Sequence, residues 1–274
     1  MKYTLDELYN VQGKAVVISG GTSGIGLELA GALLDLGAKV AVLGHEESST
    51  QKAKESLEKR GDTSVPAFTV NVTDLAGVTE VFQKIFQEFG RIDGLVNCAG
   101  INSIEALHSA NMEKYRQVLD VNLMGTIHCC RAVAPYMLAQ NSGRVVNISS
   151  LSSIRGKRYY TAYASSKAAI NGFTRALAVE WAQNGITVNA IAPGMIVTAI
   201  NRREIEENPE SYQKRVESIP RGCAGRTEWL VAPVVMFLSD GAPHVTGQCL
   251  FCDGGSSIGD TFIMEKEKQG PLKI

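Results

Sequence analysis

Tyr163 and Lys167 are the residues whose types and spacing point most directly to chemistry. They are four positions apart in a helical pattern, so they share one face of the helix. A phenol with a reference pKa of about 10 is a weak base at neutral pH. An ammonium group ~5 Å away, at an effective dielectric constant of ~20, favours the phenolate by about 3 kcal/mol. We therefore expect Lys167 to lower the pKa of Tyr163 by roughly two units and make it a general acid/base.

Taken alone, this pair also fits an exposed helix surface, but two further residues favour the catalytic interpretation. Ser150 lies thirteen residues before Tyr163, just after an apolar run at 144–148. Ligands of open parallel sheets bind beyond the carboxyl ends of the strands, where a hydroxyl can donate to a substrate carbonyl oxygen. Ser149 competes with Ser150 for this role. Asn122 lies inside a helical pattern, where asparagine is only a middling helix former and indicates some other task.

A glycine-rich turn precedes the first helical pattern. The turn contains Gly20, Gly24 and Gly26. It follows the apolar run at 15–18 and leads directly into the helical pattern. Glycines permit a tight turn and a close approach to a phosphate, and the new helix directs its N–H groups at that anion. The context of strand, turn and helix predicts a nucleotide phosphate site. The alternative is a glycine-rich turn that binds nothing.

Short apolar runs that alternate with amphipathic stretches must position these residues. Apolar strands that are each followed by a helix predict a parallel sheet covered on both faces. Right-handed crossovers then give an α/β fold, a Rossmann-like doubly wound parallel sheet of about seven strands. The expected strands are 15–18, 40–43, 65–72, 94–96, 144–148, 186–191 and 248–252, and the expected helices are 24–36, 48–60, 74–89, 111–139 and 161–183.

The 274 residues show neither an internal repeat nor an interdomain linker. We predict a single nucleotide-binding catalytic domain over 1–274 with a core at about 13–255, a polar excursion over the site at 195–225 and a polar tail at 259–274. The chain is 45% hydrophobic and 20% charged, which excludes wholesale disorder. A formal charge of -1 gives no electrostatic footprint for nucleic acid or an anionic membrane.

Several absences favour a cytoplasmic protein. The sequence has no apolar run of the ~20 residues that span a bilayer, and its start lacks the pattern of a secretory signal. Its six cysteines are too sparse for a disulfide framework. Cys249 and Cys252 form a C-x-x-C string, but in a strand they face opposite sides. No metal site is predicted.

With the G-xxx-G-x-G spacing and the Tyr163–Lys167 pair, the chain resembles the short-chain dehydrogenase/reductase superfamily in its compact single-domain branch, from about Gly13 to Gly255. The resemblance implies an NAD(P)-dependent oxidoreductase that transfers hydride between a secondary alcohol or ketone and nicotinamide. It implies that Tyr163 is the acid/base, that Lys167 lowers its pKa and binds the nicotinamide ribose, that Ser150 polarises the carbonyl, and that Asn122 holds a water in a proton relay. Ser19 stands where the family has threonine.

The resemblance also implies a set of cofactor contacts. Residues 97–100 resemble the Asn-Asn-Ala-Gly element, with Cys98 in place of the second asparagine, and Asn71 with Val72 resembles the Asp-Val adenine contact. The segment 193–198 is expected to hold the nicotinamide carboxamide and the pyrophosphate side. The expected cofactor-binding residues are Gly20, Thr22, Ser23, Gly24, Ile25, Gly26, His45, Asn71, Val72, Asn97, Ala99, Gly100, Tyr163, Lys167, Pro193, Gly194, Ile196 and Thr198.

The choice between NAD and NADP depends on the end of the second strand. An acid there binds the ribose 2′-hydroxyl of NAD and repels the 2′-phosphate of NADP, and this chain has Gly44. The missing carboxylate slightly favours NADP. Ser23 and His45 nevertheless stand where basic residues are common, and Glu46 would repel a phosphate, so NAD stays open. His45 fits an exposed loop residue equally well.

The loops at 100–108, 151–161 and 195–222 are polar, which favours a sugar, polyol or sugar acid as the small-molecule substrate. Arg155 and Arg202 are candidates to hold a carboxylate. The stretch 247–255 is similar to that of gluconate 5-dehydrogenase-type members. The expected substrate contacts are Ser150, Ser152, Arg155, Tyr160, Tyr163 and Met195.

Two alternative functions stay open. One is a reductase of the 3-oxoacyl-acyl-carrier-protein type. The other is a non-catalytic dinucleotide sensor, against which the complete set of Ser150, Tyr163, Lys167 and Asn122 argues. The resemblance also implies a homotetramer or homodimer.

Overall fold

The computed structural model describes residues 4, 8–61, 63–198 and 205–259. Seven strands form one parallel sheet in the order β3-β2-β1-β4-β5-β6-β9. The chain order reverses between β1 and β4, as in a doubly wound sheet, so the predicted fold is confirmed. The strands are β1 (Ala15–Ser19), β2 (Lys39–Gly44), β3 (Ala67–Thr69), β4 (Gly94–Asn97), β5 (Gly143–Ile148), β6 (Ile186–Pro193) and β9 (Cys249–Cys252).

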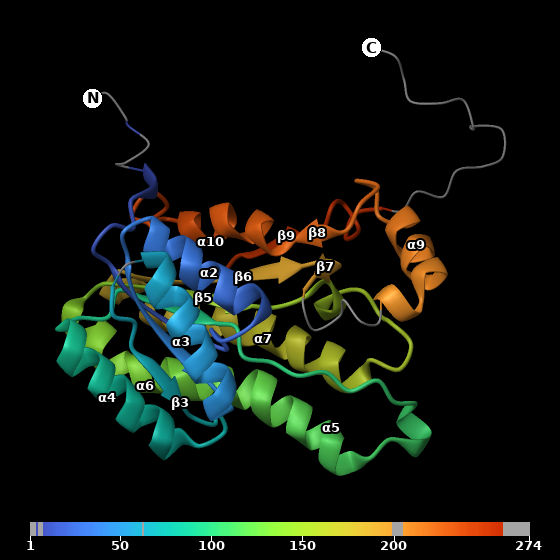
Figure 1. Ribbon diagram of the computed structural model, residues 1–274, viewed down its shortest axis with the longest axis horizontal. Coiled ribbons are helices and arrows are strands. Elements are labelled where there is room, and N and C mark those ends of the chain that lie inside the picture. The colour runs from blue at the N-terminus through green and yellow to red at the C-terminus, as the bar shows by residue number, and fades with distance from the viewer. Residues whose placement is uncertain (1–3, 5–7, 62, 199–204, 260–274) are drawn as a thin grey trace.

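Helices cover both faces of the sheet (Figure 1). One face carries α2 (Gly24–Asp35), α3 (Glu47–Gly61) and α10 (Val231–Leu238), and the other carries α4 (Leu75–Phe89), α6 (Gly125–Gln140) and α7 (Thr161–Trp181). Within β1, Val16 and Ile18 belong to the hydrophobic core between the sheet and α2, α3 and α10, whereas Val17 belongs to the core on the opposite face. All three side chains are fully buried. Burial on both faces explains why the strands are continuous apolar runs.

Local capping residues fix the ends of the helices near the site. Asp74 caps α4 by accepting from the Ala76 amide at 3.1 Å. Gly90 ends the same helix with φ 74°, and Gly37 follows α2 with φ 79°. Both positions need the left-handed backbone that glycine adopts without strain.

The third strand is shorter than predicted. It spans Ala67–Thr69 rather than 65–72, and it pairs only with β2 at the edge of the sheet. Its partner β2 ends at Gly44, opposite Thr69, so the residues that follow have no strand to pair with.

The single helix expected over 111–139 is interrupted. It consists of α5 (Met112–Leu119), a π-helical turn η2 (Asp120–Met124) and α6. Such π-turns widen a helix by one residue and occur frequently at functional sites. Asn122 lies in this turn.

The excursion at 195–225 contains its own small sheet. β7 (Ile196–Val197) pairs in parallel with β8 (Gly225–Arg226), and α9 (Pro209–Glu217) lies between them in the chain, beyond β7 in Figure 1. Arg202 and the tail after residue 259 lie outside the described residues.

Among the helices that the structure describes, none is both long and apolar enough to cross a bilayer.

Candidate active site

A cleft of about 670 Å³ lies beyond the carboxyl ends of β1, β4, β5 and β6. The glycine turn, the loops after the other three strands and the start of α7 line it. The predicted site residues that it brings together are Gly20, Ser23, Gly24, Ile25, Ala99, Gly100, Ser150, Ser152, Tyr160, Tyr163, Lys167, Pro193, Gly194, Met195, Ile196 and Thr198. Segments more than 140 residues apart in the chain thus meet in one cavity.

The glycine turn has the close packing that a phosphate-binding turn requires. Gly20 has φ 67°, and a Cβ atom there would lie 2.7 Å from Ala99 Cα. A Cβ atom at Gly26 would collide with the Gly20 carbonyl oxygen. The Ser23 side chain makes no capping hydrogen bond to α2, so it leaves the first amides of that helix to other partners. Backbone N–H groups at the start of a helix are suited to the pyrophosphate of a dinucleotide.

Lys167 is held in the floor of the cleft. Its Nζ donates to the Ile148 carbonyl at 2.7 Å, and only 4% of the residue is exposed. The same Nζ lies 5.7 Å from the centroid of the Tyr163 ring. Burial lowers the pKa of Lys167 to about 8. The ammonium is therefore close enough to act on the phenol, and its own charge is sensitive to pH near neutrality.

Tyr163 differs from the sequence-based expectation in the direction of its pKa. Burial raises the pKa of Tyr163, and a hydrogen bond with Ser150 lowers it only in part. Loss of water from the buried phenol disfavours the phenolate, an effect that the spacing of two residues does not reveal. Lys167 loses water as well, and it is bonded to Ile148 rather than to the phenol. At neutral pH the phenol is protonated and is a proton donor.

Asn122 fastens the loop after β4 to the wall of the cleft. Its Oδ1 accepts from the Ile101 amide at 2.8 Å, and its Nδ2 donates to the Ile101 carbonyl at 3.0 Å and to Ser166 Oγ at 2.9 Å. A Cβ atom at Gly100 would lie 3.2 Å from Asn122 Oδ1 and 3.5 Å from Lys167 Nζ, so these two side chains are neighbours. The side chain is thus fully engaged in positioning, and the water relay stays a prediction.

Asn97 and Cys98, at the end of β4, have different positions relative to the cleft. Asn97 Nδ2 donates to Asn147 Oδ1 at 2.9 Å, and Asn147 Nδ2 donates to Thr174 Oγ1 at 2.9 Å, so Asn97 braces β4, β5 and α7 beneath the cleft rather than lining it. Cys98 lines the cleft. Burial raises the pKa of its thiol to about 11, so the sulfur is protonated and uncharged.

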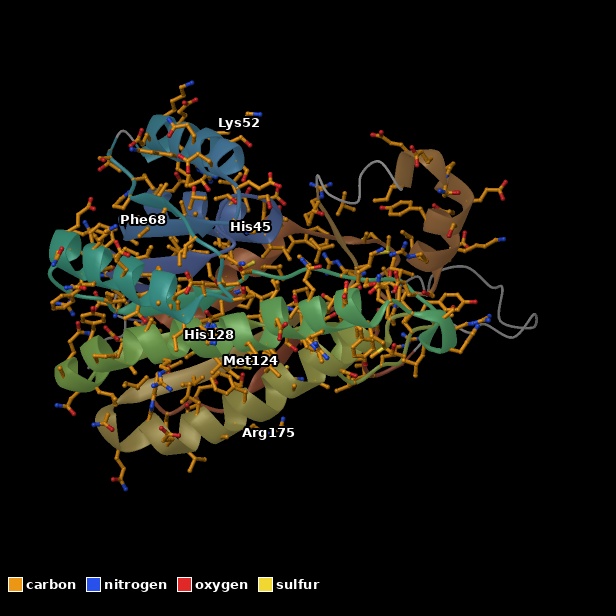
Figure 2. All side chains as sticks on the ribbon, turned by 90° about the horizontal axis from the view of Figure 1, so that it is seen from below. His45, Lys52, Phe68, Met124, His128 and Arg175 are labelled. Carbon is orange, nitrogen blue, oxygen red and sulfur yellow. The ribbon has the colours of Figure 1, made fainter. Side chains whose placement is uncertain are left out.

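Besides Asn97, five predicted cofactor contacts lie outside this cleft, along the carboxyl ends of the strands or behind the glycine turn. They are Thr22, Gly26, His45, Asn71 and Val72. His45, labelled in Figure 2, is exposed on the loop from β2 to α3. Asn71 Oδ1 accepts from the Thr73 amide at 3.0 Å, and the Val72 carbonyl bonds to His128 Nδ1 at 2.9 Å. Asn71 thus shapes its own turn, and the adenine contact stays a prediction.

Gly44 is packed more tightly than the sequence indicates. A Cβ atom there would collide with Thr50 Oγ1 and lie 2.6 Å from Thr22 Cγ2. The acid that would read a ribose 2′-hydroxyl therefore has no room at this position.

Of the predicted substrate contacts, Arg155 is turned away from the cleft. Its Nη1 donates to the Ser256 carbonyl at 2.9 Å, so it ties two loops together and does not line the cavity. This contact does not support the role of Arg155 as a carboxylate ligand, which stays a prediction. The Tyr160 ring meets the Tyr163 ring edge-on, with centroids 6.3 Å apart. Ile101, Lys157 and Arg215 also line the cleft, and no motif in the sequence marks them.

The chain is similar in sequence and in structure to known proteins. A family model described as Enoyl-(Acyl carrier protein) reductase matches residues 20–257. The chain is 39% identical to a 3-oxoacyl-(acyl-carrier-protein) reductase of Thermotoga maritima, over 90% of this chain and 99% of the relative. A solved structure of a provisionally assigned NAD(P)-dependent gluconate 5-dehydrogenase from Beutenbergia cavernae, with NADP bound, superposes with a TM-score of 0.84 at 36% identity and covers 91% and 98% of the two chains. An NAD+-bound xylitol dehydrogenase superposes with a TM-score of 0.85 at 28% identity and covers 89% and 99%.

Proposed function

We propose a function for this chain, which belongs to the short-chain dehydrogenase/reductase superfamily and is an oxidoreductase. It interconverts a secondary alcohol and a ketone on a polyhydroxylated small molecule, and Tyr163 is the acid/base. The observation that carries the proposal is the meeting of Ser150, Tyr163 and Lys167 with the glycine turn in one cleft. The relatives' own names, as dehydrogenases and reductases, argue against the non-catalytic sensor.

The arrangement supports a simple division of labour. A bound nicotinamide dinucleotide supplies the hydride acceptor or donor. The glycine turn would hold its pyrophosphate, and Lys167 and Thr198 its nicotinamide end. In the direction of reduction, the protonated Tyr163 hydroxyl donates its proton to the carbonyl oxygen while Ser150 donates a second hydrogen bond to it. In oxidation, the Tyr163 phenolate takes the hydroxyl proton instead.

Tyr163→Phe tests this assignment. We expect turnover to fall by about 10²- to 10⁴-fold, the range typical of a lost general acid/base. Binding of the reduced cofactor, followed by its fluorescence, should change less than about threefold, because the phenol is not needed to hold the dinucleotide. Tyr136→Phe is a matched control, since Tyr136 stacks on Phe86 outside the cleft. A Tyr163→Phe enzyme that keeps most of its rate would contradict the acid/base role.

We further propose that NADP is the preferred dinucleotide. Gly44, packed against Thr22 and Thr50, supports this, because the end of β2 then carries no carboxylate to oppose a 2′-phosphate. Comparison of kcat/KM for NADP and NAD with the same substrate measures the preference. A strong preference for NAD would show that another group reads the ribose.

For the substrate we propose a sugar, polyol or sugar acid. Ser150, Ser152, Tyr160 and Lys157 give the cleft hydroxyl and ammonium groups that suit such molecules. The similarity to structures named for gluconate and xylitol points the same way. A 3-oxoacyl thioester is the second candidate, favoured by the relative from Thermotoga maritima. Nicotinamide absorbance measured with sorbitol, xylitol, gluconate and acetoacetyl-CoA would separate the two classes.

Assembly and compartment complete the proposal. Met112, Met124 and Val179 are exposed apolar side chains on α5, η2 and α7, which supports a homotetramer or homodimer. All six cysteines are free thiols in the structure, which supports a reducing compartment such as the cytoplasm. Sedimentation analysis of the purified protein, with a monomer as the contradicting result, tests the assembly.

A further inference from the structure

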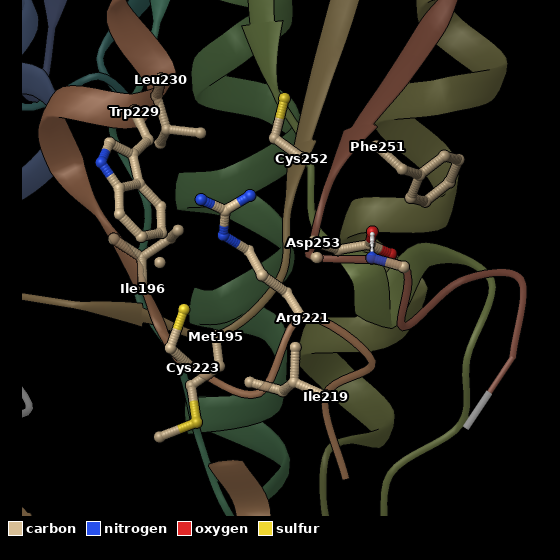
Figure 3. Close-up of a pocket in the computed structure, with 13 residues that line it drawn as sticks. Met195, Ile196, Ile219, Arg221, Cys223, Trp229, Leu230, Phe251, Cys252 and Asp253 are labelled. Atoms are coloured by element: carbon tan, nitrogen blue, oxygen red, sulfur yellow. Dashed lines mark hydrogen bonds between the residues drawn. The ribbon is translucent and has the colours of Figure 1, made fainter. Parts of the chain in front are cut away.

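A second cavity, of about 350 Å³, adjoins the cleft. Met195 and Ile196 line both cavities, so the two spaces are separated at most by these two side chains. The remaining walls come from the segments 219–230 and 251–255, which lie far apart in the chain (Figure 3). Of the residues that line this second cavity, the roles above use Met195 and Ile196.

Arg221 projects its guanidinium into this cavity between Trp229 and Cys252 (Figure 3). The guanidinium lies 4.8 Å from the centroid of the Trp229 ring, and the Arg221 amide donates to the Gly254 carbonyl at 3.0 Å, which fixes the base of the side chain. Within the described part of the chain, no carboxylate pairs with this guanidinium. An arginine stacked on an aromatic ring keeps its planar set of N–H donors free for a carboxylate.

Positive charge is concentrated around Trp229. Arg226 lies 5.8 Å from the same ring and does not line the cavity, so two guanidinium groups flank one indole but only Arg221 reaches the ligand space. Of these two groups, Arg221 is the one placed to contact an anion in the cavity.

Asp253 adds an acceptor on the other side of Arg221 in Figure 3. It is 9% exposed, and its Oδ1 accepts from the Gly255 amide at 2.9 Å. Its Oδ2 is buried and has no hydrogen-bond partner among the described residues. An unsatisfied buried acceptor is unfavourable, and a small rotation of the Asp253 side chain toward the cavity would let a ligand hydroxyl satisfy it. A carboxylate alone would be repelled by Asp253, so the ligand must carry hydroxyl groups as well.

We propose that this second cavity binds the carboxylate end of a polyhydroxy acid, with Arg221 holding the carboxylate and Asp253 accepting a hydrogen bond from a hydroxyl. The inference rests on the proposed function and names its substrate class as a sugar acid rather than a neutral polyol or an acyl thioester. On this proposal the carboxylate ligand is Arg221 and not Arg155, whose guanidinium bonds to Ser256.

Gluconate and sorbitol form a matched pair of probes, because they differ in a carboxylate against a hydroxymethyl group. Arg221→Gln should raise KM for gluconate by about 10- to 100-fold, the range expected for a lost charge-assisted pair, and should change kcat less than about twofold. KM for sorbitol should stay within about twofold. Arg226→Gln is the control, since it removes the other guanidinium beside Trp229 and should affect neither substrate.

Arg221→Lys separates charge from geometry. It keeps the positive charge but loses the planar pair of donors, so it should fall between the wild type and Arg221→Gln for gluconate. Equal effects of Arg221→Gln and Arg226→Gln would overturn the proposal, because they would indicate a general charge effect. An unchanged KM for gluconate in Arg221→Gln, or a wild type that oxidises sorbitol but not gluconate, would overturn it as well and leave the proposed function standing.

A wild type that turns over no alcohol or ketone would instead refute the proposed function. In that case saturation-transfer NMR with sodium gluconate, on the full chain with NADP present, decides the inference. A gluconate signal that is present for the wild type and lost in Arg221→Gln would support the cavity. No signal for the wild type would overturn it.

Discussion

Asn122→Ala removes the side chain that joins the π-turn to the rest of the cleft. In the structure this fully buried side chain makes three hydrogen bonds, to the amide and carbonyl of Ile101 and to Ser166 Oγ. Alanine cannot replace any of them, and the Ile101 amide is then left without its acceptor. Ser166 still donates to the Tyr163 carbonyl at 2.7 Å, so the start of α7 keeps one of its ties.

The expected loss of stability follows from these contacts. Each buried hydrogen bond contributes about 1 kcal/mol net, and an unsatisfied buried partner costs about 1–3 kcal/mol. Asn122→Ala should therefore lower the free energy of unfolding by roughly 2–4 kcal/mol. For a chain of this size, that corresponds to a fall in Tm of roughly 5–15 °C. Turnover should fall as well, because the loop at 99–101 lines the cleft beside Lys167.

Urea unfolding at constant protein concentration measures this difference. Asn111→Ala is the matched control, because Asn111 caps α5 by accepting from the Glu113 amide at 2.9 Å but is exposed. Its loss should cost about 1 kcal/mol and leave turnover near the wild-type value. A loss of less than about 1 kcal/mol in Asn122→Ala, with turnover abolished, would refute the positioning argument and leave the water relay as the explanation.

Two further predictions follow from the packing and the charges. Gly44→Asp should not create a preference for NAD and should destabilise the fold by about 1–3 kcal/mol, because its Cβ atom would overlap Thr22 and Thr50. Titration with both dinucleotides measures the preference, and urea unfolding measures the stability. A stable variant that prefers NAD would contradict this prediction. Because burial raises the pKa of Tyr163, the phenol form that reduction needs is fully present below that pKa, whereas the phenolate that oxidation needs appears only as the pH approaches it. Initial rates from about pH 6 to about pH 10 should therefore rise with pH for oxidation but not for reduction, and an oxidation rate that is already maximal at the acid end would be inconsistent with a raised pKa.

Local sequence signals were enough to predict most of the framework. The apolar runs predict all seven strands because both faces of the sheet are buried, and Gly37, Asp74 and Gly90 mark helix ends through backbone conformation and capping alone. β3 was overestimated because its length depends on where its neighbour β2 ends. That information lies more than twenty residues away in the chain.

The site residues were predictable from the sequence where they belong to a short motif. They were not predictable where they depend on a long-range contact. The glycine turn and the Tyr163–Lys167 spacing each lie within a few residues. The partner of Arg155, by contrast, is Ser256, and the cavity that holds Arg221 is closed by residues on both sides of α10. No local pattern separates an arginine that ties loops together from one that faces a ligand.

The ionisation of the acid/base shows why position in the chain does not determine chemistry. The i, i+4 spacing correctly brings the Lys167 ammonium to within 5.7 Å of the Tyr163 ring. The sign of the shift in the pKa of Tyr163 nevertheless depends on burial, which comes from the loops after β4, β5 and β6. The same burial lowers the pKa of Lys167 to about 8, and its Nζ donates to the Ile148 carbonyl. Loss of water therefore raises the pKa of Tyr163, which makes the phenol a proton donor at neutral pH.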